Sequence, residues 1–140
     1  MLSVIINTKN EEKNIANCLH SIRRQNFNTG KMEIIVVDNN STDQTKGIAR
    51  QYTDKVFNLG PERSAQRNFG AHKAQGEILG FIDADMILSS RVIAEVAEKF
   101  ESDKNLAGLY INEKIVDSVD SVETRDLASL QNLQNQQFFH

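Results

Sequence analysis

The chain has 140 residues, of which 39% are hydrophobic and 25% charged, and its formal net charge is −3. That length allows one domain with a sizeable buried core, and the composition is typical of a globular protein. The negative balance provides no basic field for nucleic acid or anionic lipid, so neither is expected as a partner.

Four short apolar runs, rich in β-branched residues, alternate with segments of helical spacing. The runs are predicted as strands at Ser3–Asn7, Glu33–Asp38, Lys55–Asn58 and Ile78–Asp83. The second run shows no polar alternation, as expected for a strand that is covered on both faces. Alternating strands and helices imply right-handed crossovers, so we expect an α/β fold with a mostly parallel sheet and helices on both faces.

Helices are predicted after the strands, around Ile15–Ile22, around Ile48–Tyr52, from Pro61 to about Gly76, and at Ser90–Phe100. Residues 10–12 and 41–43 are expected to cap the first two helices, and Gly76 is expected to end the third. A less regular extended stretch, Leu106–Val116, and a terminal helix from about Val119 to Phe138 are predicted after them.

Cys18 is the one cysteine, which excludes an internal disulfide and a cysteine-based zinc cluster. It lies at helical spacing from Ile15 and Ile22, so a buried, unreactive thiol is expected rather than a nucleophile. The apolar run at the N-terminus, Leu2–Ile6, is too short for a signal-peptide core or a membrane span. We therefore expect a cytoplasmic protein with no transmembrane segment.

Polar residues end three of the four predicted strands: residues 7–11, 38–41 and 83–85. In an open parallel sheet, ligands bind outside the carboxyl ends of the strands. All three polar ends fall on that edge, so the sequence predicts a ligand site there.

Asp83 and Asp85 are separated by one residue, so in extended backbone both side chains would point to the same side. Two carboxylates held close together repel unless a cation lies nearby, and their oxygens suit Mg²⁺ or Mn²⁺ shared with substrate phosphates. The alternative is a solvated loop that begins after a strand. The position at the ligand edge favours the metal.

A phosphate-binding loop is absent from the sequence, as is the glycine fingerprint of dinucleotide-binding proteins. A diphosphate would need a metal, basic side chains or helix N-termini instead. Arg63, Arg67 and Lys73, on the predicted third helix, are candidates, although charged helix residues usually face solvent. The three histidines are scattered and show no zinc-binding spacing.

Taken together, the motifs resemble the inverting family-2 glycosyltransferases. The resemblance rests on four segments, which occur in the order of that family: residues 3–12 (SVIINTKNEE), 33–43 (EIIVVDNNSTD), 64–70 (SAQRNFG) and 76–85 (GEILGFIDAD). It implies the Rossmann-like GT-A fold with strand order 3-2-1-4. It also implies a nucleoside-diphosphate sugar as the donor, with a UDP-sugar favoured, and transfer to an acceptor with inversion.

The same resemblance implies a set of site residues. The nucleotide-sugar site would be formed by Thr8, Asn10, Glu11, Asp38, Asn40, Arg67 and Asp83, and Mn²⁺ or Mg²⁺ would be held by Asp85 and Asp83. In this set Thr8 and Glu11 line the nucleoside pocket, and Asp38 bonds the edge of the base. Arg67 contacts the base or neutralises the diphosphate. The carboxylate of Asp83 holds the ribose or the water shell of the metal, and that of Asp85 binds the metal directly.

Two departures from the family pattern are visible. Asn7 replaces a usual proline and Asn39-Asn40 replaces the commoner Asp-Gly, but each replacement is compatible with a turn. Relatives usually continue into an acceptor-binding half, which supplies the carboxylate that takes the acceptor proton. Four carboxylates follow the donor half, at positions 117, 120, 123 and 126, and their spacing singles out none as the general base.

We accordingly expect a donor-binding domain at residues 1–116 and a C-terminal helical segment at 117–140, where an acceptor half would begin. In that segment Leu127, Leu130 and Leu133 form an apolar stripe on the predicted helix. The stripe would pack against the sheet of the same chain or, if left exposed, favour a homodimer.

Three functions are thus compared. The first is a glycosyltransferase, or its donor half. The second is a nucleotide-sugar-binding module or truncated protein without transferase activity of its own. The third, a nucleotide-binding domain without sugar chemistry, is disfavoured by the four matching segments.

Overall fold

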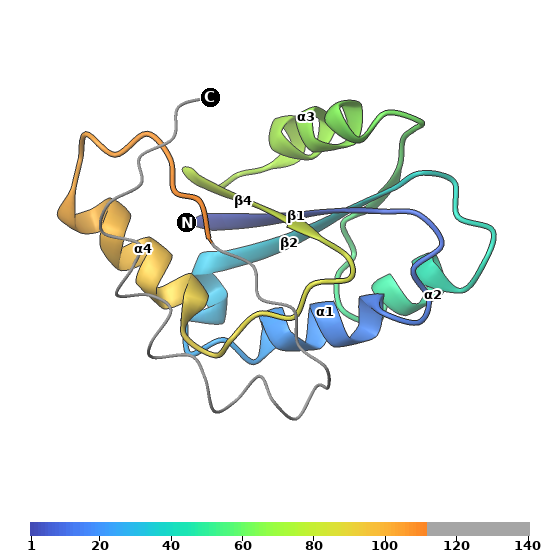
Figure 1. Cartoon of the computed structure of the whole chain (residues 1–140), viewed down its shortest axis with the longest axis horizontal. Coiled ribbons are helices and arrows are strands. Elements are labelled where there is room, and N and C mark those ends of the chain that lie inside the picture. Colours follow the sequence, from blue (N-terminus) through green and yellow to red (C-terminus); the bar gives the residue numbers. More distant parts are fainter. Residues whose placement is uncertain (112–140) are drawn as a thin grey trace. The chain divides into compact units, whose positions relative to one another are not determined.

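A computed structural model describes residues 1–111 of the chain (Figure 1). They belong to two compact units, one made of residues 1–24 and 28–86, the other of residues 25–27 and the chain from 87 onward. The predicted terminal helix, the boundary after residue 116 and the proposed dimer stripe lie outside the described residues, and so does the end of the predicted extended stretch. The described part of that stretch, 106–111, has no regular secondary structure.

The first unit is built on a parallel sheet, as the sequence predicts. Its strands are β1 (Leu2–Thr8), β2 (Met32–Asp38), β3 (Val56–Asn58) and β4 (Ile78–Asp83). Their order is β3-β2-β1-β4, which confirms the expected 3-2-1-4 arrangement. In register, Ile5 at the centre of β1 lies between Ile35 of β2 and Phe81 of β4.

Helices cover both faces of this sheet, which confirms the prediction of an α/β fold with helices on both faces. They are α1 (Ile15–Arg23), α2 (Thr45–Ala49) and α3 (Arg63–Lys73), with a short 3₁₀ turn, η1, at Thr29–Lys31. In Figure 1, α3 lies on one face, and α1 and α2 lie on the other. One side of α1 is buried, where Ile15, Leu19 and Ile22 recur at helical spacing around Cys18.

α3 approaches the sheet closely at Gly70, which has no side chain. The buried residues of α3 are Gln66 and Gly70. A Cβ atom added to Gly70 would lie 2.4 Å from Cγ2 of Ile5. Ile5, Ile35 and Val37 form the core beneath the helix. The absence of a side chain at Gly70 therefore sets the distance between α3 and the ends of β1 and β2.

The helix boundaries differ from the expected ones. α1 begins at Ile15 after Asn14, and α2 begins at Thr45 after Gln44, so the residues that directly precede the two helices are not the predicted ones. Of the predicted capping residues, Asp43 does bond the beginning of α2, because its Oδ1 accepts from the N–H of Thr45 at 3.0 Å. Likewise, α3 ends at Lys73 and not at Gly76. Gly76 instead packs against β1, where its N–H donates to Ser3 Oγ at 2.9 Å.

The second unit contains α4 (Val92–Ser102), close to the helix predicted at Ser90–Phe100. The short segment 25–27 belongs to this unit because it is bonded to the beginning of α4. Gln25 Oε1 accepts from the N–H of Ile93 at 3.0 Å, and the N–H of Asn26 donates to the carbonyl of Ser90 at 2.8 Å. Within residues 1–111, no helix is long and apolar enough to cross a membrane.

A partly buried ion pair lies near the amino ends of β2 and β3. Glu33 accepts from Lys55 Nζ, from Ser3 Oγ and, at 2.6 Å, from the N–H of Gln75. Burial opposes ionisation of this carboxyl, but these hydrogen bonds and the charge of Lys55 lower the pKa of Glu33 from 4.5 to about 2.

This cluster predicts a pH dependence of folding. Since the pKa of Glu33 is lower in the folded protein, its ionisation stabilises the fold above pH 4.5, and that contribution is lost as the pH falls towards 2. We expect Glu33→Gln to lower the free energy of unfolding at pH 7 by on the order of 2 kcal/mol and to flatten its dependence on pH between 4.5 and 2. Urea unfolding across that range measures both, with Glu101→Gln, an exposed carboxylate on α4, as the control. An unchanged slope in Glu33→Gln would contradict the assignment.

Candidate active site

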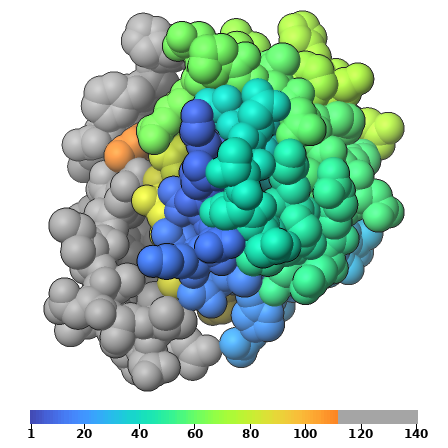
Figure 2. Space-filling view, turned by 90° about the vertical axis from the view of Figure 1, so that its right-hand side faces the viewer, coloured from blue at the N-terminus to red at the C-terminus, as the bar shows by residue number. Residues whose placement is uncertain are grey.

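The polar strand ends meet at one edge of the sheet, as expected. Thr8 at the end of β1 lies in register with Asp38 of β2, and its neighbour Asn7 lies in register with Asp83 of β4. Figure 2 looks onto this edge, where the loop after β1 (blue) lies against the loop after β2 (teal). The parallel topology thus brings residues that are distant in sequence within reach of one ligand.

Asp38 is more deeply buried than the sequence suggests. Its side chain is 0% exposed. One carboxylate oxygen accepts from the N–H of Ser41 at 2.7 Å and the other from the hydroxyl of Ser41. A direct bond to the edge of a base would require this carboxylate to become accessible. The geometry favours a different role, in which Asp38 fixes the loop that follows β2.

Asn39, which the sequence reasoning did not select, is the more accessible neighbour of Asp38. Its side chain is partly buried, and its Nδ2 donates to the carbonyl of Pro61 at 3.1 Å. The side chain also fills the space beside Gly60, where an added Cβ would lie 1.9 Å from Asn39 Oδ1. Asn39 therefore ties the end of β2 to the segment that leads into α3.

Thr8 carries an unsatisfied polar atom. The residue is 4% exposed, and its Oγ1 is a buried side-chain oxygen without a hydrogen-bond partner among the residues that the structure describes. A buried hydroxyl without a partner costs free energy, so a polar ligand group at this position would relieve that cost. Thr8 is therefore a candidate for contact with a ligand, although its oxygen, like the carboxylate of Asp38, would have to become accessible.

Gln66 is a second residue that the sequence reasoning missed. It is 2% exposed, and its Nε2 donates to the carbonyls of Val37, at 2.7 Å, and Thr8, at 3.3 Å. The signal was available, since Gln66 lies four residues before Gly70 and therefore on the same face of α3. It fixes the ends of β1 and β2 relative to the helix.

Arg67 lies over the ends of β1 and β4. Its Nη2 is 3.3 Å from Asp83 Oδ1, and its Nε is 3.4 Å from Asn7 Oδ1. The two charged side chains are partly exposed, at 44% and 29%, so solvent screens the pair. The guanidinium thereby remains available for an anion while it offsets one of the two aspartate charges.

Asp85 lies beyond the strand, which corrects the expectation of extended backbone. β4 ends at Asp83, and the chain turns there, with the N–H of Met86 donating to the carbonyl of Asp83 at 3.1 Å. Asp85 is exposed, and within residues 1–111 it makes no hydrogen bond or ion pair. Its carboxylate oxygens are therefore all available to a ligand.

The thiol of Cys18 lies beneath this turn, 3.7 Å from the carbonyl of Asp83. Burial, and then the negative charges of Asp85 and Asp83, raise the pKa of the thiol from 9.0 to about 12. The cysteine is consequently a neutral core residue, as the sequence predicts, and not a nucleophile.

The donor set fits a divalent metal that is shared with a ligand. No group of three or more metal-binding side chains occurs in the described part of the chain, so a closed protein cage does not fit here. Two carboxylates at one turn, of which Asp85 is unpaired, do fit Mg²⁺ or Mn²⁺, because such ions bind one or two carboxylates and complete their shell with water and substrate phosphates.

The loops beside these carboxylates contain the other predicted residues. Asn10 and Asn40 have φ values of 50° and 48°, in the left-handed region that asparagine tolerates better than most residues. Asn10 Oδ1 accepts from the N–H of Thr42 at 2.9 Å, and Glu11 Oε2 accepts from Asn14 Nδ2 at 2.8 Å. Asn10 and Glu11 are thus engaged in loop contacts, whereas Asn40 is exposed.

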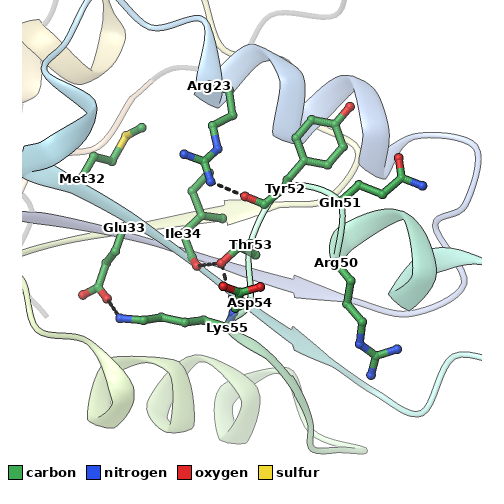
Figure 3. A pocket seen from close by; sticks show the side chains of 10 residues that line it. All are labelled: Arg23, Met32, Glu33, Ile34, Arg50, Gln51, Tyr52, Thr53, Asp54 and Lys55. Atoms are coloured by element: carbon green, nitrogen blue, oxygen red, sulfur yellow. Dashed lines mark hydrogen bonds and ion pairs between the residues drawn. The ribbon is translucent and has the colours of Figure 1, made fainter.

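A separate open pocket of about 360 Å³ lies beside the beginning of β2, away from the strand ends (Figure 3). Two of its cations already have partners: Arg23 donates to the carbonyl of Tyr52, and Lys55 pairs with Glu33. The remaining arginine, Arg50, extends away from Arg23 and Lys55 in Figure 3. This arrangement offers no converging set of groups for a diphosphate.

The strand-end site can be compared with known proteins. The family model for Glycosyl transferase family 2 matches residues 3–136. The chain belongs to this family. Family-2 relatives include glycosyltransferase AglE of Haloferax volcanii, which is 42% identical over 91 residues, and the poly(ribitol-phosphate) β-N-acetylglucosaminyltransferase TarS of Staphylococcus aureus, which is 35% identical over 105 residues. These alignments cover 60% and 68% of this chain.

Solved glycosyltransferases share the fold. S. aureus TarS 1–349 in complex with UDP-GlcNAc superposes with a TM-score of 0.66 at 34% identity, over 72% of this chain and 31% of that one. The mannosyltransferase PcManGT of Pyrobaculum calidifontis, in complex with GDP-Man and Mn²⁺, gives 0.71 at 25% identity, over 81% of this chain and 35% of that one. The fold is therefore the GT-A fold that the sequence implied.

The family-2 chain is short beside its relatives. It spans 30% of the length of AglE and 18% of that of TarS. The family model itself, over residues 3–136, includes the carboxyl ends of β1 to β4.

Proposed function

We propose that the chain binds a nucleoside-diphosphate sugar at the carboxyl edge of its sheet, with a divalent metal at Asp85 and Asp83, for inverting transfer of the sugar to an acceptor. The observation that carries the proposal is the exposed carboxylate of Asp85, which no described residue pairs, at the turn where Arg67 and Asp83 already meet. A UDP-sugar is the favoured donor, and the Mn²⁺ in the complex of PcManGT makes Mn²⁺ the first metal to test.

Each group has a distinct role in this proposal. The Thr8 hydroxyl donates to the nucleoside, which satisfies its otherwise unpaired oxygen. Arg67, a planar cation with several N–H donors, turns from Asp83 towards the diphosphate. When bound, the metal stabilises the negative charge that develops on the departing nucleoside diphosphate. Glu11 and Asn40 line the site, while Asp38 and Asn10 hold the loops around it.

The second candidate is a donor-binding module that needs another chain segment or protein for transfer. This candidate is kept because the general base stays unidentified among residues 1–111. The cytoplasmic location, the residue-116 boundary and the homodimer also stay predictions.

Isothermal titration calorimetry with UDP, GDP and their sugars, each with and without Mn²⁺, tests the proposal. We expect nucleotide binding that strengthens at least about tenfold with Mn²⁺, because the cation offsets the charges of both the aspartates and the diphosphate. Absence of binding by every nucleotide would overturn the function. Release of free sugar from the donor by the same protein would separate the enzyme from the binding module.

A further inference from the structure

The loops that follow β1 and β2 are cross-bonded to each other by a set of side chains. We call this set the loop clasp; it consists of Asn10, Glu12, Ser41, Asp43 and Thr45. Each member accepts a hydrogen bond from a backbone N–H of the opposite loop. Three of these bonds are donated by the first loop: from the N–H of Asn10 to Ser41 at 2.8 Å, of Glu11 to Thr45 at 2.8 Å and of Glu12 to Asp43 at 3.3 Å. Two are donated by the second loop: from the N–H of Thr42 to Asn10 at 2.9 Å and of Gln44 to Glu12 at 3.0 Å.

The clasp is reciprocal at its centre. The N–H of Asn10 donates to Ser41 Oγ, while the N–H of Thr42 donates to Asn10 Oδ1. Neither loop can move without breaking bonds made by the other. The backbone bond from the N–H of Asn39 to the carbonyl of Thr8, at 2.8 Å, continues the same connection to the strand ends.

Ser41 joins the clasp to the buried carboxylate. Its single hydroxyl proton is donated to Asp38, so its oxygen is free to accept from the N–H of Asn10. A chain of hydrogen bonds therefore runs from the first loop, through Ser41, to the end of β2. Ser41 is 7% exposed and Asp38 0%, so water competes little for these bonds.

We infer that Asn10 and Ser41 are positioning residues for the nucleoside end of the donor site. They act by holding the loop after β1, with Thr8 at its beginning, in fixed register with the loop after β2. This inference rests on the proposed function, because it assumes that a nucleotide binds at this edge. It differs from a direct role of Asn10 in binding, since the Asn10 side chain is engaged with Thr42.

The nucleoside end of a donor is held equally in the ground state and the transition state. Loss of its positioning should therefore weaken donor binding and raise KM while kcat changes little. A general loss of stability would not produce that selective change.

Asn10→Gly is the test variant, because glycine accepts the φ of 50° and removes only the side-chain acceptor. We expect UDP affinity, measured by calorimetry with Mn²⁺, to fall about tenfold. Asn10→Asp keeps an acceptor oxygen and should restore most of the affinity. Ser41→Ala should weaken binding to a similar degree, and Ser41→Thr, which keeps the hydroxyl, should restore it.

Thr53→Val is the matched control. Thr53 Oγ1 donates to the carbonyl of Ile34 at 2.8 Å and accepts from the N–H of Lys55 at 3.1 Å. This variant therefore also removes bonds between a side chain and the backbone, but away from the carboxyl ends of the strands. Its UDP affinity should match that of the original protein. Amide hydrogen exchange should show lost protection at Thr42 in Asn10→Gly and retained protection in Thr53→Val.

The outcomes separate the two claims. UDP binding by the original protein that is unchanged in Asn10→Gly and Ser41→Ala would overturn this inference and leave the proposed function standing. An equal loss of UDP affinity in Thr53→Val would show that the clasp contributes only to the stability of the fold, and this result would also overturn the inference. Absence of nucleotide binding by the original protein would overturn the proposed function and this inference with it.

Discussion

Asp85→Ala is expected to lower the affinity for UDP in the presence of Mn²⁺ by at least about 100-fold and to abolish the gain that Mn²⁺ provides. The reason is geometric: Asp85 is exposed at the turn after β4 and, unlike Asp83, has no ion pair with any residue from 1 to 111, so it is the one ready to bind the metal. Calorimetric titrations with and without Mn²⁺ measure both quantities. The free energy of unfolding should change by less than about 0.5 kcal/mol, because an exposed, unpaired side chain contributes little to stability.

Asp54→Ala is the matched control for Asp85→Ala. Asp54 is also an exposed aspartate in the first unit, but it lines the pocket beside the beginning of β2. Its removal changes the net charge equally and should leave Mn²⁺-dependent binding intact. If Asp85→Ala bound UDP as the original protein does, with the same response to Mn²⁺, the metal would have to be held elsewhere.

Gly70→Ala is expected to destabilise the fold by about 1–3 kcal/mol, although alanine is the better helix former. The added methyl group would meet Cγ2 of Ile5 at 2.4 Å, in a buried core that has no free space to yield. α3 must move outward, which carries Gln66 and Arg67 away from the strand ends. We therefore expect weaker UDP binding as well, with urea unfolding and calorimetry as the two measurements.

Gly47→Ala supplies the matched control in α2. There the added methyl would come no closer than 3.3 Å, to the flexible side chain of Gln44, and the position is exposed. Only the higher helix propensity of alanine should then matter, and it should stabilise the protein by up to about 1 kcal/mol. Equal effects of the two substitutions would show that close packing of α3 is not what Gly70 provides.

The sheet could be predicted from the sequence because its signal is local and strong. The unbroken apolar run from Ile34 to Val37 is typical of a strand covered on both faces, and polar residues mark its end. Convergence of Thr8, Asp38 and Asp83 then follows from parallel topology alone. The order of the strands came from the resemblance, since the spacing of the apolar runs along the sequence does not determine it.

The loops could not be predicted in the same way. Residues 10–12 and 41–43 carry side chains that favour helix caps, but several of them, among them Asn10 and Ser41, bond the opposite loop, about 30 positions away in the sequence. Local spacing reports nothing about such partners. The turn that buries Asp38 could have been predicted from the sequence. Aspartate side chains often bond backbone N–H groups a few residues further on, as Asp38 does with Ser41.

The ion pair between Arg67 and Asp83 has a thermodynamic consequence. Together with Asp85, these side chains carry a single net negative charge, too little to hold a divalent cation tightly in water. A diphosphate without the metal would be repelled by two carboxylates, and the one guanidinium nearby is already paired with Asp83. With the proposed metal and donor both present, Arg67 and the cation share the negative charges of the aspartates and the diphosphate. Each ligand should then raise the affinity of the protein for the other by the same factor.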